Sequence, residues 1–100
     1  MSAAKLEQQG ESRYRVTGEL SFATVTELLL QSRSLFAGES TLEVDLSGVT
    51  HADSAGLSLL IEWLRQAKLQ GRQLRYLALP VQLSALASIS EVEGLLSSSA

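Results

Sequence analysis

Three neighbouring residues carry the side chains that could do chemistry: His51 offers a base, Asp53 a carboxylate and Ser54 a hydroxyl. In a hydrolase triad such groups form a chain of hydrogen bonds, in which the base lies between the nucleophile and the carboxylate. Side chains from nearly adjacent positions of one loop diverge, so these three cannot easily form that chain. We therefore predict that the protein is not an enzyme, and that His51 faces solvent or a partner.

The rest of the composition offers little other chemistry. The 100 residues include no cysteine and one histidine, which leaves no thiolate or histidine cluster to bind a metal. Gly48 and Gly56 do not fit the phosphate-binding pattern G-x-x-x-x-G-K-[ST]. A net charge of −3 without a strongly basic face argues against nucleic acid as a partner. We expect no catalytic residue, metal or cofactor.

The segment 45–57 instead has the features of a contact surface, because it leads from a predicted strand into a predicted helix. Either Asp53 or Ser54 can cap that helix, and capping alone could explain these short polar side chains. A hydroxyl at a helix N-terminus is also exposed, fixed in direction and surrounded by unpaired amides, which suits a partner contact or a phosphorylation site. The small residues Ala55 and Gly56 would let the backbone of another protein come close.

Strands and helices alternate along the chain and indicate how this segment is held. The length allows a single domain over residues 1–100, with an aliphatic core drawn from 20 leucines. Polar–apolar alternation predicts strands, and apolar residues at helical spacing predict helices. The predicted elements are strands over 3–9 and 12–17 around a turn at Gly10, a helix that Ser21 caps and Gly38 ends, a strand over 41–46, a loop over 47–52, a helix ended by Gly71, a strand over 73–79 and a helix from Pro80.

Apolar spacing also predicts the inner face of each helix. The first would bury Phe22, Val25, Leu29 and Phe36, the second Leu57, Leu60, Ile61 and Leu64, and the third Leu83, Leu86 and Ile89, with Val92, Leu95 and Leu96 in a last turn. Leu59 and Trp63 widen the apolar arc of the second helix. They would contact either a neighbouring helix or a partner.

The order ββαβαβα predicts an α/β fold with a mixed four-stranded sheet, in which one antiparallel hairpin precedes parallel pairs. Three strands alternate charged with apolar residues; the charged ones are Arg13, Arg15, Glu43, Asp45 and Arg75. If these side chains share a face, that face is wet, with opposite charges paired across strands. Otherwise they lie at frayed strand ends of a sheet covered on both sides. We expect helices mainly on one face and a strand order that advances in one direction.

Two further features bear on location and partners. No apolar run approaches the roughly 20 residues that cross a bilayer, and the first five residues lack an apolar signal core, so we expect a cytoplasmic domain. Four basic and no acidic residues lie between Arg65 and Arg75. They mark either a solvated helix end or a surface that docks to an acidic partner or to lipid head groups.

The pattern Asp-Leu-Ser-Gly-Val over 45–49, followed by Asp-Ser-Ala-Gly-Leu over 53–57, resembles the signature of STAS domains, the sulfate-transporter and anti-sigma-factor-antagonist family. The likeness covers nearly the whole chain. Within the family, residues 17–20, 53–60 and 67–71 are most similar to the small STAS subunits of bacterial Mla phospholipid ABC transporters. Those relatives carry Thr where this chain has Ser54.

This resemblance implies a non-catalytic accessory subunit. Such a subunit binds the cytoplasmic ATPase of an inner-membrane transporter, in complex with its permease, and supports its assembly and activity in maintaining outer-membrane lipid asymmetry. Ser54 would lie in the contact with the ATPase, and the protein would be peripheral to the inner membrane through that partner. The alternative is an anti-sigma-factor antagonist, whose partner, an anti-sigma-factor kinase, phosphorylates Ser54.

Further contact residues are expected just before the first helix, because that strand-to-helix junction should open toward the same end of the sheet. Packing in the core is a second role open to Phe22. The predicted partner-binding residues are Glu19, Ser21, Phe22, His51, Asp53, Ser54, Ala55 and Gly56.

Overall fold

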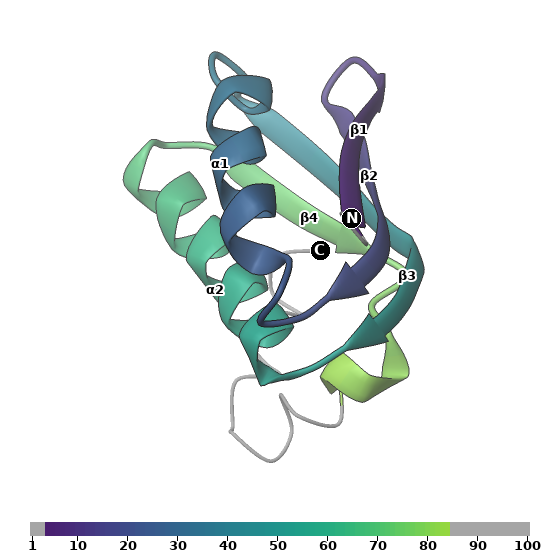
Figure 1. The fold of residues 1–100 in the computed structure, drawn as a ribbon. Helices are drawn as coiled ribbons and strands as arrows, with labels where there is room; N and C mark the ends of the chain where they lie inside the picture. The colour runs from purple at the N-terminus through teal and green to yellow at the C-terminus, as the bar shows by residue number, and fades with distance from the viewer. Residues whose placement is uncertain (1–3, 85–100) are drawn as a thin grey trace.

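Four strands form one sheet in the computed structural model, which describes residues 4–84 (Figure 1). The strands are β1 (Ala4–Gly10), β2 (Arg13–Leu20), β3 (Thr41–Ala52) and β4 (Gln73–Leu77), and the helices are α1 (Val25–Leu35) and α2 (Ser54–Leu69). The spatial order is β1-β2-β3-β4, with β1 and β2 antiparallel and the other pairs parallel. The predicted mixed sheet and its one-directional order are confirmed.

The hairpin of β1 and β2 turns at Glu11 and Ser12, and Ser12 adopts a left-handed φ of 60°. Two-residue hairpin turns favour such positive φ values because they match the twist of the flanking strands. Gly10 pairs with Arg13 across this turn. β2 then runs to Leu20, beyond its predicted end at 17, because β3 pairs with it that far.

Segment 47–52, predicted as a loop, is the second half of β3. Its pairing with β2 contains two register shifts, and such bulges bend and twist a strand. Gly48 lies beside the first shift, where a Cβ atom would come 2.7 Å from Cγ2 of Thr17. The prediction was wrong because glycine and short polar residues are typical of loops, and only the neighbouring strand makes this segment extended.

Both helices cover one face of the sheet and lie side by side on it (Figure 1). The strands turn alternate apolar residues toward this face, so the core forms between sheet and helices. Its largest fully buried side chains are Trp63, Tyr14, Leu20, Leu28, Leu42, Leu46, Leu60, Leu83, Val16 and Val44.

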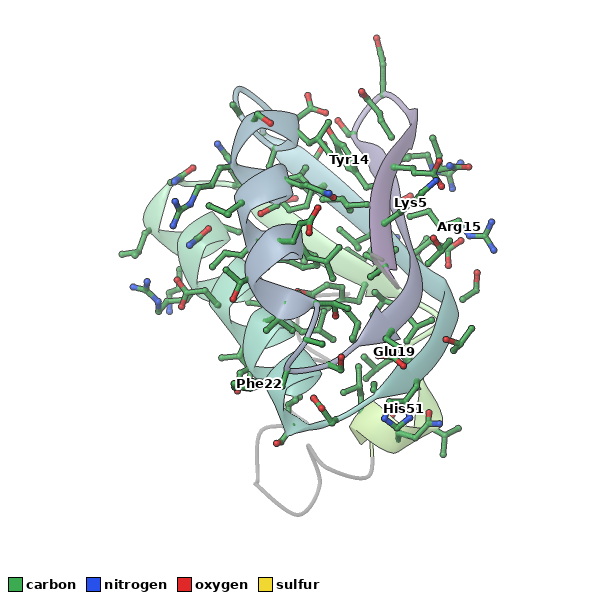
Figure 2. All side chains as sticks on the ribbon, viewed as in Figure 1. Lys5, Tyr14, Arg15, Glu19, Phe22 and His51 are labelled. Carbon is green, nitrogen blue, oxygen red and sulfur yellow. The ribbon has the colours of Figure 1, made fainter. Side chains whose placement is uncertain are left out.

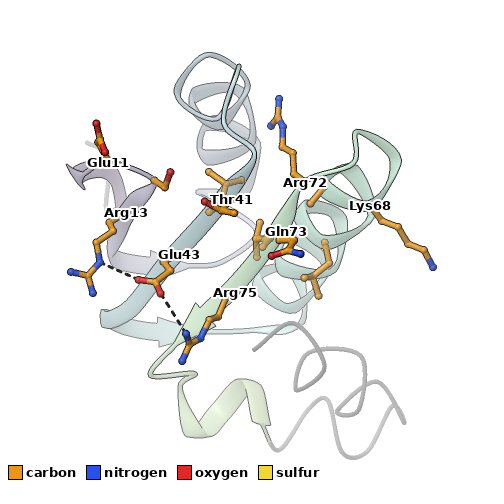
Figure 3. Close-up of a pocket in the computed structure, with 13 residues that line it drawn as sticks. Glu11, Arg13, Thr41, Glu43, Lys68, Arg72, Gln73 and Arg75 are labelled. Atoms are coloured by element: carbon orange, nitrogen blue, oxygen red, sulfur yellow. Dashed lines mark hydrogen bonds and ion pairs between the residues drawn. The ribbon is translucent and has the colours of Figure 1, made fainter.

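The opposite face of the sheet carries charged side chains. Nε of Arg13 donates to Oε1 of Glu43 at 3.0 Å (Figure 3). Nη1 of Arg75 forms an ion pair with Oε2 of the same glutamate at 3.5 Å. Glu43 therefore joins side chains from three adjacent strands. Across residues 4–84, the predicted wet face with opposite charges paired across strands is confirmed for Arg13, Glu43 and Arg75, whereas Nε of Arg15 is buried without a hydrogen-bond partner. Both α1 and α2 lie on the other face, which argues against the alternative of a sheet covered on both sides.

Helix α1 begins at Val25, and the prediction that Ser21 caps it was wrong. The carbonyl of Ser21 accepts the N–H groups of Thr24 at 2.9 Å and Val25 at 3.0 Å, which makes a turn before the helix. Phe22 lies in this turn and is 85% exposed, so its predicted core role was also wrong. Gly38, with φ of 81°, follows the helix as expected.

The additional apolar residues of α2 face α1. Trp63 is buried, and its Nε1 donates to Oγ of Ser32 in α1 at 2.9 Å. Leu59 is buried as well. The interpretation of these two residues as a contact with a neighbouring helix is confirmed, since Trp63 bonds to Ser32 of α1 and Leu59 shares a hollow with Val25 and Leu29 of α1. Gly71 follows α2 with the expected positive φ of 70°.

β4 ends at Leu77, before its predicted end at residue 79. The next residue, Ala78, takes a left-handed φ of 57°. The carbonyl of Pro80 accepts the N–H groups of Leu83 and Ser84, so a helix starts after Pro80 as predicted, and Leu83 is buried. The predictions for Leu86, Ile89, Val92, Leu95 and Leu96 fall outside the described residues. Between residues 4 and 84, no helix is both long and apolar enough to cross a membrane.

Candidate functional site

The connections β2–α1 and β3–α2 meet at one end of the sheet. The N–H of Asp53 donates to the carbonyl of Leu20 at 3.1 Å, which ties the end of β3 to the end of β2. Figure 2 shows Glu19, Phe22 and His51 at this end of the molecule, away from Tyr14. We call residues 19–22 and 51–56 the corner. The expectation that both junctions open toward the same end is confirmed.

Asp53 is the N-cap of α2, which settles the choice between Asp53 and Ser54. Its Oδ1 accepts the N–H groups of Ala55 at 2.9 Å and Gly56 at 3.2 Å. These are two of the amides that the first turn of a helix leaves unpaired. The backbone of Asp53 is extended, with φ of −123° and ψ of −169°, as an N-cap requires.

The second carboxylate oxygen of Asp53 reaches the other connection. Its Oδ2 accepts the N–H of Phe22 at 3.3 Å. Partial burial acts to raise the pKa of Asp53, but the N–H groups of Gly56, Phe22 and Ala55 outweigh it, so the pKa lies below its ordinary value. The group is therefore ionised at neutral pH, and among residues 4–84 the hydrogen bonds to its carboxylate all come from backbone N–H groups.

Ser54 is the first residue of α2, and its side chain is exposed. Its carbonyl accepts a hydrogen bond from Oγ of Ser58 at 3.1 Å. The rigid cap at Asp53 fixes the backbone on one side and the helix fixes it on the other. The Cα–Cβ bond of Ser54 is consequently held at the surface, and the predicted exposure of its hydroxyl agrees with the structure.

Gly56 lies inside the corner and is buried. A Cβ atom at this position would lie 2.5 Å from the carbonyl oxygen of Leu20 and 2.7 Å from its Cβ. Glycine is needed here because the first turn of α2 packs directly on the end of β2. The structure corrects the expectation that Gly56 offers its backbone to a partner, since its small size serves packing within the chain.

Ser21 is also buried, which contradicts the expectation that its side chain reaches the surface. Its Oγ donates to Oε2 of the half-buried Glu19 at 3.1 Å. Thr24, which the sequence prediction missed, organises this turn: its Oγ1 donates to the carbonyl of Glu19 at 2.8 Å and accepts the N–H of Ser21 at 3.0 Å. The spacing Thr24-x-x-Glu27, typical of a helix start, was a signal for the N-cap position of Thr24, although its side chain makes no cap hydrogen bond.

The remaining predicted residues differ in exposure. Phe22, His51 and Ser54 are exposed, while Asp53 and Ala55 are half-buried. The structure thus brings all eight predicted residues to one corner and makes three of them fully available at its surface. Within residues 4–84, no three His, Cys, Asp or Glu side chains gather in a way that could hold a metal ion.

A different hollow, with a volume of about 920 Å³, lies at the opposite end of α2 (Figure 3). Residues of the hairpin, the starts of β3 and β4 and the last turns of α2 line it. Two of the four basic residues between 65 and 75 have acidic partners, since Arg65 binds Glu62 and Arg75 binds Glu43. The basic stretch is therefore partly neutralised.

A family model described as "Mlab, STAS domain" matches residues 4–97 of the chain. The chain is also 36% identical over 77 residues to the intermembrane phospholipid transport system binding protein MlaB of Haemophilus influenzae. That match covers 72% of each protein.

Two solved structures are similar in fold. The unphosphorylated anti-sigma factor antagonist SpoIIAA superimposes with a TM-score of 0.69 at 18% identity, over 92% of this chain and 84% of that one. The phosphorylated form of SpoIIAA, a Bacillus cell fate determinant, superimposes with a TM-score of 0.69 at 19% identity, over 92% and 86%. At these identities the likeness concerns the fold alone.

Proposed function

The chain belongs to the STAS domain family, and on this basis we propose that it is a non-catalytic accessory subunit of an inner-membrane phospholipid ABC transporter. It binds the cytoplasmic ATPase subunit, in complex with the permease, and supports the assembly and activity of the transporter. The 36% identity to a protein named as part of a phospholipid transport system supports this choice within the family.

One structural observation carries the proposal: Ser54 is exposed at the first position of α2, with its backbone fixed by the Asp53 cap. A rigid exposed group lowers the entropy cost of docking, because little freedom is lost when a partner binds it. The same geometry does not favour catalysis. Among residues 4–84, every hydrogen bond to the Asp53 carboxylate comes from a backbone N–H group and none from His51, so the chain of hydrogen bonds that a triad needs is not formed.

The test is co-purification of the tagged chain with its cognate ATPase and permease after co-expression. The unaltered chain is expected to retain both proteins, and Ser54→Arg is expected to lose them because the larger charged side chain blocks the contact. Ser34→Arg is the matched control, because Ser34 is exposed near the C-terminal end of α1, away from the corner. Circular dichroism should show that both variants stay folded. Failure of the unaltered chain to retain the ATPase contradicts the proposal.

The alternative function remains an anti-sigma-factor antagonist controlled by phosphorylation of Ser54. It predicts binding to a kinase-like anti-sigma factor instead of an ABC ATPase. Incubation with that kinase and ATP, followed by intact-protein mass spectrometry, would then show one added phosphate that Ser54→Ala abolishes. No added phosphate, together with retention of the transporter proteins, excludes this alternative.

A further inference from the structure

Phe22 is the most exposed large hydrophobic side chain in the described part of the protein, at 85%. It lies in the short connection between β2 and α1, at the same corner as Ser54. An exposed phenyl ring contributes nothing to the core of its own chain. In protein interfaces, by contrast, a few large side chains on well-ordered backbone supply most of the binding free energy.

The backbone on both sides of Phe22 is held by hydrogen bonds. On the C-terminal side, the carbonyl of Ser21 accepts the N–H groups of Thr24 and Val25. On the N-terminal side, the N–H of Ser21 donates to Oγ1 of Thr24 at 3.0 Å. The ring is therefore exposed on a fixed turn and not on a free loop.

Asp53, from a distant part of the sequence, adds a further hydrogen bond to this turn. Its Oδ1 caps α2 through Ala55 and Gly56, and its Oδ2 accepts the N–H of Phe22. One carboxylate thus fixes the two connections relative to each other, and with them the positions of Phe22 and Ser54. Charged acceptors make stronger hydrogen bonds than neutral ones, so an ionised carboxylate suits this role.

A shallow hollow of about 380 Å³ lies between the N-terminal halves of α1 and α2. Val25, Leu29, Ala55 and Leu59 line it together with Thr26, Ser58 and Glu62. A partner that covers the corner therefore meets a protruding ring beside an apolar depression. This shape is complementary to a protein surface with an apolar pocket for the ring, and not to a hydrated anion.

We propose that Phe22 is the apolar anchor of the docking corner, that it inserts into an apolar pocket of the ATPase subunit, and that Asp53 is the positioning residue that holds it outward. This inference rests on the proposed function and specifies the chemistry of its interface. It also assigns Asp53 a role beyond capping α2, since the same side chain prepares the neighbouring connection for binding.

The anchor is tested by the affinity of the full-length chain for the purified cognate ATPase, measured by biolayer interferometry. Phe22→Ala is expected to weaken binding by about tenfold or more, as is typical of truncating an anchoring aromatic residue. Leu69→Ala is the matched control, because Leu69 is 71% exposed at the opposite end of α2. It should bind like the unaltered chain. Both variants should keep the unaltered melting temperature, since neither side chain is buried.

The role of Asp53 is tested with Asp53→Asn. Asparagine still caps α2 through its carbonyl oxygen, but its NH₂ group is a donor and cannot accept the N–H of Phe22. Hydrogen exchange of the Phe22 amide in the free protein should therefore be about tenfold faster, the effect of losing one charge-assisted hydrogen bond. Asp53→Asn should also weaken ATPase binding, and it should weaken it much less when Phe22 is already alanine.

These measurements separate the possible outcomes. If the unaltered chain binds the ATPase and Phe22→Ala binds within about threefold of it, the anchor is refuted while the proposed function stands. Unchanged exchange of the Phe22 amide in Asp53→Asn, or additive effects of the two substitutions, refutes the positioning role. If the unaltered chain itself does not bind, the proposed function fails, and amide exchange still decides whether Asp53 holds Phe22.

Discussion

Ser32 and Trp63 are joined by a hydrogen bond inside the core, where the indole Nε1 of Trp63 donates to Oγ of Ser32 at 2.9 Å. The same Oγ donates to the carbonyl of Leu29 at 2.7 Å, so both hydrogen-bonding capacities of the hydroxyl are used. Ser32 lies in the second half of α1 and Trp63 in the second half of α2, so this pair links the two helices away from the corner.

The first prediction concerns that bond. Ser32→Ala leaves the buried indole N–H without an acceptor, which should lower the free energy of unfolding by about 1–3 kcal/mol. Urea denaturation followed by tryptophan fluorescence measures it. Ser34→Ala, an exposed change two positions along the same helix, should stay within about 0.5 kcal/mol of the unaltered protein. Equal stability of the two variants would show that the buried bond is not important.

The second prediction concerns Gly56. Gly56→Ala should destabilise the protein, because the added Cβ would meet the Leu20 carbonyl oxygen at 2.5 Å. The cost of overpacking, about 1–3 kcal/mol, exceeds the gain of about 1 kcal/mol that alanine brings to a helix. Thermal unfolding is the measurement. Gly10→Ala is the control, since no heavy atom lies within 4 Å of a Cβ built there. A more stable Gly56→Ala protein would contradict the close packing of α2 on β2.

The third prediction concerns the pH dependence that Asp53 creates. Its folded pKa is lower than the unfolded value of 3.8, so its contribution to stability is present above pH 3.8 and is lost as the pH falls through the folded value. The carboxyl carbon of Asp53, followed by NMR, should titrate with a midpoint below 3.8. Asp53→Asn should show a smaller loss of stability on acidification. A midpoint at or above the unfolded value would contradict the three backbone hydrogen bonds.

The fourth prediction concerns the charged face of the sheet. Glu43→Gln removes the carboxylate between Arg13 and Arg75, whose side chains are 66% and 54% exposed. Because exposed ion pairs are screened by water, the loss should be below about 1 kcal/mol. It should shrink further in about 1 M salt, where the Debye length is about 3 Å. Chemical denaturation at low and high salt measures the difference. A loss that is large and independent of salt would show that Glu43 acts through packing.

Local sequence patterns predicted most of the architecture. The alternation of apolar and charged residues in β2, β3 and β4 identified both the buried face and the charged face, because successive side chains of a strand point to opposite sides. Apolar spacing in α2 identified Leu57 and Leu60 as core residues. The pattern around Asp53 and Ser54 identified the start of α2 and the end of the sheet to which it belongs.

Two features of the corner could not be predicted in this way. The segment 47–52 has the composition of a loop, yet β2 pairs with it and makes it part of β3. If α1 began directly after Ser21, helical spacing would place Phe22 on the buried face of the helix. The turn organised by Thr24 delays the helix and leaves the ring outside.

The sequence by itself determined the order of the elements, the two faces of the sheet and the position of the exposed hydroxyl, because these depend on interactions between residues close together along the chain. Only the tertiary structure decided that Asp53 bonds to Phe22, that Gly56 packs on Leu20 and that Trp63 meets Ser32. Each of these contacts joins residues more than 30 positions apart. Such pairs acquire their partners only when the strands and helices come together, so no local pattern contains them.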